Sequence, residues 1–65
     1  MTIGSQVRKY RKLKRWTLRE LGERSGLAIG TLSDIEVDRR PGSIKAVTKI
    51  AEALGVDLDY LFKKE

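Results

Sequence analysis

Apolar residues recur along this chain with helical spacing, and no stretch shows the alternation of a strand. The first apolar stripe predicts a helix that begins near Thr2 or Ser5 and ends at about Lys14. One side of this helix is therefore apolar, and much of the remainder is basic. The apolar positions are Ile3, Val7 and Tyr10, with Leu13 at the edge.

The clearest helix start is at Thr17, because Glu20 follows it with the spacing of a capping box. In that motif each of the two side chains accepts a hydrogen bond from the other residue's backbone amide. A second helix is therefore predicted over residues 18–25. Gly26 can adopt the left-handed conformation that ends a helix at this point.

A third helix is expected from Ala28 or Ile29 to Glu36. Few of its residues should face the core, namely Leu32 and Ile35, which lie beside Leu27. The outward positions are then Ile29, Gly30, Ser33, Asp34 and Val37.

A basic turn containing Pro41, which cannot continue a helix, separates the third helix from the fourth. Ser43 is placed to cap the fourth helix, predicted over residues 44–54 and closed by Gly55. The apolar stripe of this helix comprises Ile44, Val47, Ile50, Ala51 and Leu54.

Asp57 is placed to cap a last short helix that ends near Phe62. Five short helices joined by tight turns predict a compact all-α fold. With 65 residues, the chain is expected to form a single domain over residues 1–65.

The composition argues against an enzyme. The chain contains no Cys and no His, which removes thiol nucleophiles, most zinc sites and the commonest general base. Its carboxylates are scattered, and it has no glycine-rich phosphate loop. We therefore expect no enzymatic activity, no cofactor and no metal. No apolar run approaches the length of a membrane span and no signal-peptide core is present, so we expect a cytoplasmic protein.

Positive charge is concentrated in the first part of the chain. Residues 1–24 hold eight basic and two acidic side chains, whereas residues 25–65 hold six and seven. Such a density favours an anionic partner, although a solvated helix face would have the same composition. The densest run comprises Arg8, Lys9, Arg11, Lys12, Lys14 and Arg15.

Residues 17–36, TLRELGERSGLAIGTLSDIE, together with SIKAVTKIAEALGV at 43–56, resemble the phage repressor and Cro-type helix-turn-helix family. The resemblance extends from Ile3 to Leu61. It implies a five-helix repressor-like domain with the helix-turn-helix at its second and third helices. It also implies a prokaryotic or phage-encoded, nucleoid-associated transcriptional regulator, whose third helix enters the major groove of DNA.

The resemblance also assigns individual residues. It implies a structural ion pair between Arg11 and Glu36. The positions facing base edges would be Ala28, Ile29, Gly30, Ser33 and Asp34. The positions near phosphates would be Thr17, Leu18, Thr31, Arg39, Arg40, Ser43 and Lys45.

The sequence departs from the family's usual pattern on the reading face. Members often carry Gln where Leu18 stands, a polar cap where Ala28 stands, and long polar side chains at 29, 30 and 34. The usual Arg or Lys contact to guanine and the Asn or Gln contact to adenine are therefore missing. We expect weak direct readout, supplemented by apolar contacts and DNA shape.

Double-stranded DNA is the expected partner. Because a single recognition helix reads too few base pairs, a two-fold dimer on a palindromic operator is expected. Paired half-sites would lie roughly 34 Å apart. The candidate dimer surface is the C-terminal helix. The alternative is that its apolar residues fill the core of a monomer, which must be true of at least Leu61. The other residues of that surface are Leu58, Tyr60 and Phe62.

Two other functions fit parts of the pattern. The domain could be a protein-interaction module that uses Leu18, Ile29 and Val37 as apolar anchors. Alternatively, residues 5–16 could lie on an anionic membrane as a basic amphipathic helix. The second is less economical, because Val7 and Tyr10 are better explained as core residues.

Overall fold

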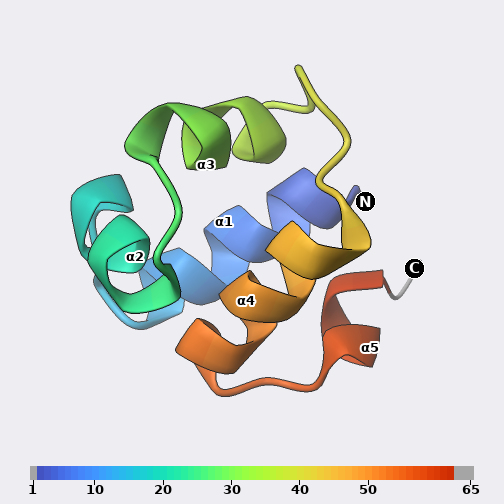
Figure 1. Ribbon diagram of the computed structural model, residues 1–65. Helices are drawn as coiled ribbons and strands as arrows, with labels where there is room; N and C mark the ends of the chain where they lie inside the picture. Colours follow the sequence, from blue (N-terminus) through green and yellow to red (C-terminus); the bar gives the residue numbers. More distant parts are fainter. Residues whose placement is uncertain (1, 63–65) are drawn as a thin grey trace.

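The computed structural model describes residues 2–62, and within that range it contains five helices and no strand. The central pair is α1 and α4; α3 packs against α1, α2 lies beside α3 and α4, and α5 contacts both α1 and α4 (Figure 1). The predicted all-α fold is confirmed. The helices are α1 (Ile3–Leu13), α2 (Leu18–Ser25), α3 (Ile29–Glu36), α4 (Ile44–Leu54) and α5 (Leu58–Phe62).

Each helix contributes at least one fully buried apolar side chain to a single core. In α1 this residue is Val7, so the apolar side of the basic helix is used inside the fold. Ile44 was expected in the α4 stripe, but it is 65% exposed. It stands in the first position of α4 after the cap, where the core does not reach it. The buried cluster comprises Val7, Leu21, Leu32, Ile35, Val47, Ile50, Ala51, Leu54 and Leu61.

Side-chain caps begin three of the helices, as their sequences require. Thr2 and Ser5 form a capping box at α1, and Thr17 and Glu20 form one at α2. The Ser43 hydroxyl accepts from the Ala46 amide at 3.1 Å at the start of α4. In contrast, Ala28 at the N-cap of α3 accepts no side-chain hydrogen bond, so the first turn of α3 has weak local support.

At the ends of α1 and α3, a residue other than glycine adopts the left-handed backbone conformation that glycine favours. Gly26 and Gly55 end α2 and α4 in this way, as predicted. Arg15 and Asp38 occupy the equivalent positions after α1 and α3, with φ of 60° and 62°. At each of these two ends the next residue's amide bonds back to the helix, as in a Schellman motif.

Replacing Arg15 by Gly is expected to raise the free energy of unfolding by about 0.5–1 kcal/mol, because glycine relieves the left-handed strain. Thermal denaturation followed by circular dichroism measures the change. Lys14 is the matched control, because its φ of −88° is ordinary and Gly there should lower stability. A loss of stability in Arg15→Gly would contradict the expectation.

Close backbone contact joins α1 to the end of α3. A Cβ atom on Gly4 would fall on the carbonyl oxygen of Ile35 and within 2.9 Å of that of Glu36. Gly4 is therefore the residue that lets the two helices approach.

A buried hydrogen bond holds α5 against α1. Gln6 of α1 is 3% exposed, and its Nε2 donates to the Tyr60 carbonyl at 3.0 Å.

Candidate nucleic-acid interface

The α2–α3 unit is held at a close crossing. Gly26 has φ of 77° and its amide donates to the Gly22 carbonyl at 2.8 Å, which ends α2. A Cβ on Gly22 would lie 2.9 Å from the Leu27 carbonyl oxygen, so the connection to α3 runs directly over α2. Leu32 and Ile35 fix the inner side of α3, at 0% and 2% exposure.

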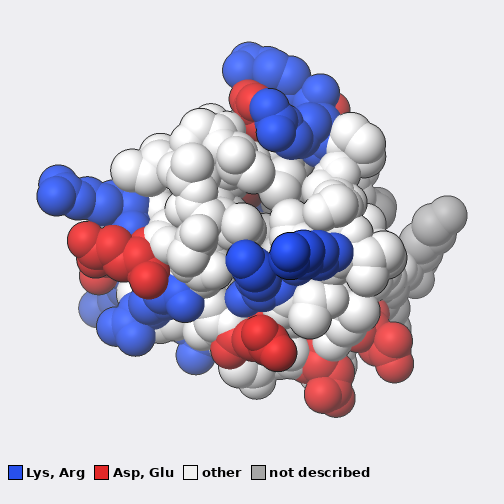
Figure 2. All heavy atoms as spheres, in the orientation of Figure 1, with Lys and Arg blue, Asp and Glu red and all other residues white. Residues whose placement is uncertain are grey.

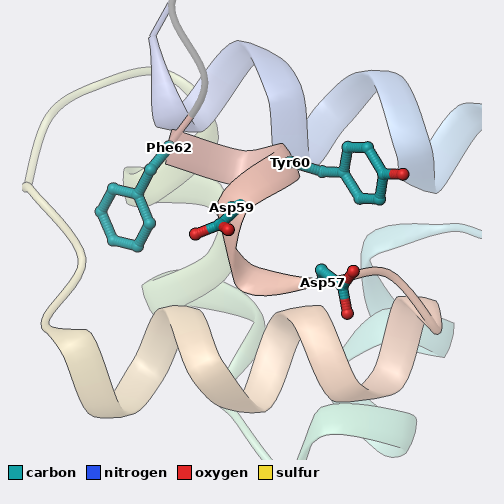
Figure 3. A pocket seen from close by; sticks show the side chains of 4 residues that line it. All are labelled: Asp57, Asp59, Tyr60 and Phe62. Carbon is teal, nitrogen blue, oxygen red and sulfur yellow. The ribbon is translucent and has the colours of Figure 1, made fainter.

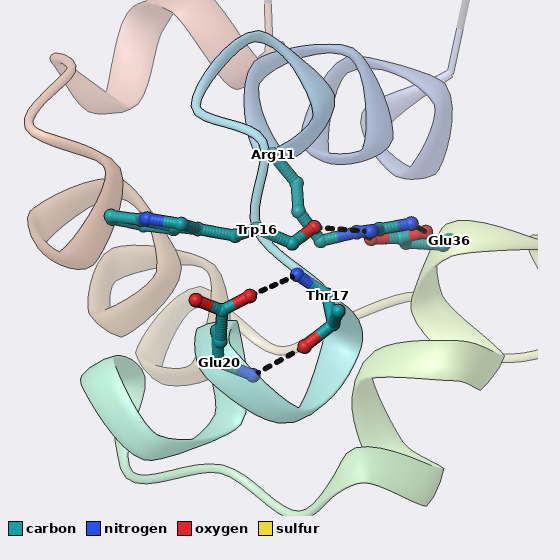
Figure 4. A network of polar contacts seen from close by, with 5 residues as sticks. All are labelled: Arg11, Trp16, Thr17, Glu20 and Glu36. Carbon is teal, nitrogen blue, oxygen red and sulfur yellow. Dashed lines mark hydrogen bonds and ion pairs between the residues drawn. The ribbon is translucent and has the colours of Figure 1, made fainter.

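A bidentate ion pair anchors the end of α3 to α1, as the resemblance implied (Figure 4). Arg11 Nε lies 2.7 Å from Glu36 Oε2, and Nη2 lies 3.0 Å from Oε1. The third guanidinium contact is to the Trp16 carbonyl at 2.7 Å. The Glu36 side chain is only 5% exposed and that of Arg11 12%. The hydrogen bond to Glu36, reinforced by charge attraction, raises the pKa of Arg11 against the effect of burial.

Trp16 lies in the connection between α1 and α2, next to this ion pair in the structure. Its half-buried ring lies beneath two cations, with the Lys14 Nζ 5.4 Å and the Arg24 guanidinium carbon 4.4 Å from the ring centre. Figure 4 shows the Thr17–Glu20 capping box directly after it in the chain. The chain entering α2 is thus fixed by a buried ion pair, a stacked ring and a cap.

The first turn of α3 is the most open part of the predicted base-reading set. Ala28, Ile29 and Gly30 are exposed, and a Cβ on Gly30 would meet no atom within 4 Å. Ser33 and Asp34, one turn later, are half-buried. The structure therefore presents a small apolar turn outward and keeps the two polar candidates closer to the fold.

The predicted phosphate residues lie at the starts of α2 and α4, in α3 and in the turn that follows α3, and their exposure differs. Leu18 packs against the core, so its backbone amide, and not its side chain, is the group offered at the start of α2. Of the three apolar anchors considered for a protein partner, this leaves only Ile29 and Val37 exposed. Thr31 is half-buried, whereas Thr17, Arg39, Arg40, Ser43 and Lys45 are exposed.

Lys and Arg atoms gather over the turn that follows α3, with acidic atoms among them (Figure 2). The carboxylate of Asp34 lies 3.1 Å from Arg39 and 3.5 Å from Arg40. A candidate base reader is thereby joined to two candidate phosphate contacts. Sequence reasoning did not predict this grouping. It also left Lys49 out of the candidate phosphate contacts, although Lys49 follows Lys45 by one helical turn on α4.

The candidate dimer helix carries an open hollow of about 470 Å³ (Figure 3). Tyr60 and Phe62 point away from each other along its walls and are 47% and 38% exposed, whereas Leu61 is 1% exposed. Leu61 thus belongs to the core, as expected. Asp57 and Asp59 complete the lining, so two acidic side chains border the hollow.

The fold and this surface define a small helix-turn-helix domain with exposed cations at Arg39, Arg40 and Lys45. The chain belongs to the helix-turn-helix family, whose model matches residues 7–61. The resemblance drawn from the sequence is therefore confirmed. Within the described residues, no helix is both long enough and apolar enough to cross a bilayer.

The proteins that this chain resembles include a repressor and a transcriptional regulator. The chain is 32% identical over 65 residues to the immunity repressor protein of Bacillus phage phi105, covering 100% of this chain and 45% of the repressor. It is 34% identical over 64 residues to the HTH-type transcriptional regulator SinR of Bacillus licheniformis, covering 97% and 58%. The chain thus spans about half the length of the curated relatives it matches. A crystal structure of SinR in complex with DNA superposes with a TM-score of 0.90 at 35% identity, covering 95% of this chain and 100% of that one.

Proposed function

We propose that this chain is a DNA-binding transcriptional regulator of the repressor type and is not an enzyme. The observation that carries the proposal is the outward first turn of α3, at Ala28, Ile29 and Gly30, together with exposed cations in the turn after α3 and at the start of α4. A helix of this size fits the major groove, and the cations would lie along the phosphates. The solved complex of SinR with DNA supports the same role.

The chemistry of the side chains suggests which residues would contact phosphates and which would contact bases. Arg39, Arg40 and Lys45, with the amides at the starts of α2 and α4, would bind phosphates. Ala28 and Ile29 would contact thymine methyl groups, and Ser33 could donate to or accept from a base edge. Most of the affinity would then come from the DNA backbone, and the regulator would act in the cytoplasm, at the nucleoid.

Binding to duplex DNA is expected to weaken steeply as salt rises. Up to three exposed cations at phosphates predict a slope between about −1 and −3 in a plot of log affinity against log salt concentration. Fluorescence anisotropy with a labelled duplex at several KCl concentrations measures it. A flat slope would contradict the proposal and would favour the protein-interaction function.

A palindromic operator and a homodimer are the corresponding proposals for assembly. Tyr60 and Phe62 would provide the contact surface on α5, because both expose part of their rings. Two copies related by a two-fold axis would present two α3 helices to half-sites roughly 34 Å apart. Sequences selected from a random DNA pool would then share an inverted repeat.

A further inference from the structure

The carboxylate of Asp34 lies between two guanidinium groups. Its Oδ1 is 3.1 Å from Arg39 Nη1, and its Oδ2 is 3.5 Å from Arg40 Nη2, so each oxygen faces one arginine. The Asp34 side chain is 22% exposed, against 73% for Arg39 and 56% for Arg40. The acid is thus the sheltered member, and the arginines lie outside it.

The main chain brings these three residues together. After α3, Asp38 takes the left-handed conformation and turns the chain back on the helix. The amides of Arg39 and Arg40 both lie close enough to donate to the Asp34 carbonyl, at 2.8 and 3.3 Å. Their side chains therefore start next to the carboxylate, and pairing with it requires little additional ordering.

A DNA phosphate and this carboxylate offer the same kind of acceptor to a guanidinium group. Within the three-residue cluster, one negative charge offsets part of two positive charges. For Arg39 or Arg40 to bind the DNA backbone, it must leave Asp34 or share its hydrogen bonds with it. Exposed ion pairs are weak, so phosphate can still win, but the gain is reduced.

We propose that Asp34 is a positioning residue that restrains Arg39 and Arg40 and thereby lowers affinity for duplex DNA whatever its sequence. This inference rests on the proposed function, because it concerns the same surface. It differs from a base-reading role for Asp34, which would change the preferred sequence and not the general affinity. Binding to random DNA rests almost entirely on phosphate contacts, so it reports the restraint directly.

The test compares Asp34→Asn with Asp38→Asn on a labelled duplex of random sequence. Both variants remove one negative charge from the same end of α3, but Asp38 accepts from the Thr2 hydroxyl and holds no arginine. Asn tolerates the left-handed conformation of residue 38. We expect Asp34→Asn to bind about tenfold more tightly at low salt, with a salt slope steeper by about 1 to 2. Asp38→Asn should gain less than about threefold, with little change in slope.

A second comparison uses Arg39→Gln in the wild type and in the Asp34→Asn background. If Asp34 restrains Arg39, the substitution should cost about twofold in the wild type and about fivefold or more in the variant. Asp34→Ala is measured in parallel, because alanine favours helix and gives an independent folded variant.

The outcomes separate the two proposals. If the wild type binds DNA with a steep salt slope but the Asp34 and Asp38 variants behave alike, the restraint is wrong and the proposed function stands. Equal costs of Arg39→Gln in both backgrounds would also overturn it. If the wild type shows no salt-dependent DNA binding, the proposed function itself fails.

Discussion

Replacing Glu36 by Gln is expected to lower the free energy of unfolding by about 3 kcal/mol. The substitution keeps the shape of the side chain but leaves the guanidinium of Arg11 without its counter-ion in a site where both partners are nearly buried. It also loosens the anchor of α3, because Glu36 is the last residue of that helix. For a domain of this size, the melting temperature should fall by more than about 10 °C in calorimetry.

The exposed pair Arg19–Glu23 provides the matched control. These side chains are 3.9 Å apart and are 80% and 70% exposed, so Glu23→Gln should change stability by less than about 0.5 kcal/mol. A small effect in Glu36→Gln, equal to that in Glu23→Gln, would show that the buried pair is not structural. Replacing both Arg11 and Glu36 by apolar residues should recover part of the loss, because no unpaired charge then remains.

Gly4→Ala is expected to destabilise the domain by about 3 kcal/mol, although alanine is the better helix former. The new methyl group would fall on the Ile35 carbonyl oxygen, which belongs to the backbone and cannot rotate aside. Either α1 must shift or the last turn of α3 must open, which would weaken the hydrogen bonds of the region around Ile35 and Glu36. Chemical denaturation monitored by circular dichroism measures the loss.

Gly30→Ala is the matched control for this substitution. The two glycines lie in helices, but a Cβ at position 30 would meet no atom within 4 Å. The same chemical change should therefore stabilise the domain there by about 0.5 kcal/mol through helix propensity alone. Opposite signs for the two variants would confirm that α1 and α3 touch at Gly4, and equal signs would contradict it.

The fold was largely predictable because its signals are local. The capping box at Thr17 and Glu20 and the left-handed closure at Gly26 depend on neighbouring residues, and both are confirmed. Ile44 shows the limit of periodicity, since spacing along a helix cannot tell how far the core extends beyond its end. Arg15 and Asp38 were also not predicted in left-handed turns, because glycine is the residue that signals them.

The site was predictable in outline and not in its interactions. The Arg11–Glu36 pair came from the resemblance, and it is confirmed by two hydrogen bonds. Asp34 was assigned by its outward position on α3, but its partners depend on where the chain turns after Val37. Gln6 gave no sequence signal of burial, because its amide pairs with a backbone carbonyl 54 residues away. Roles in DNA contact stay predictions for all of the assigned residues.

The unpacked first turn of α3 has an evolutionary consequence. Because Ala28 lacks a capping side chain and Gly30 faces open space, substitutions at these two positions leave the interior untouched. Under the proposed function, selection can therefore exchange one operator for another by small steps, without compensating changes elsewhere. The same freedom makes this turn the natural place to graft residues from a relative when a regulator with a new target is to be engineered.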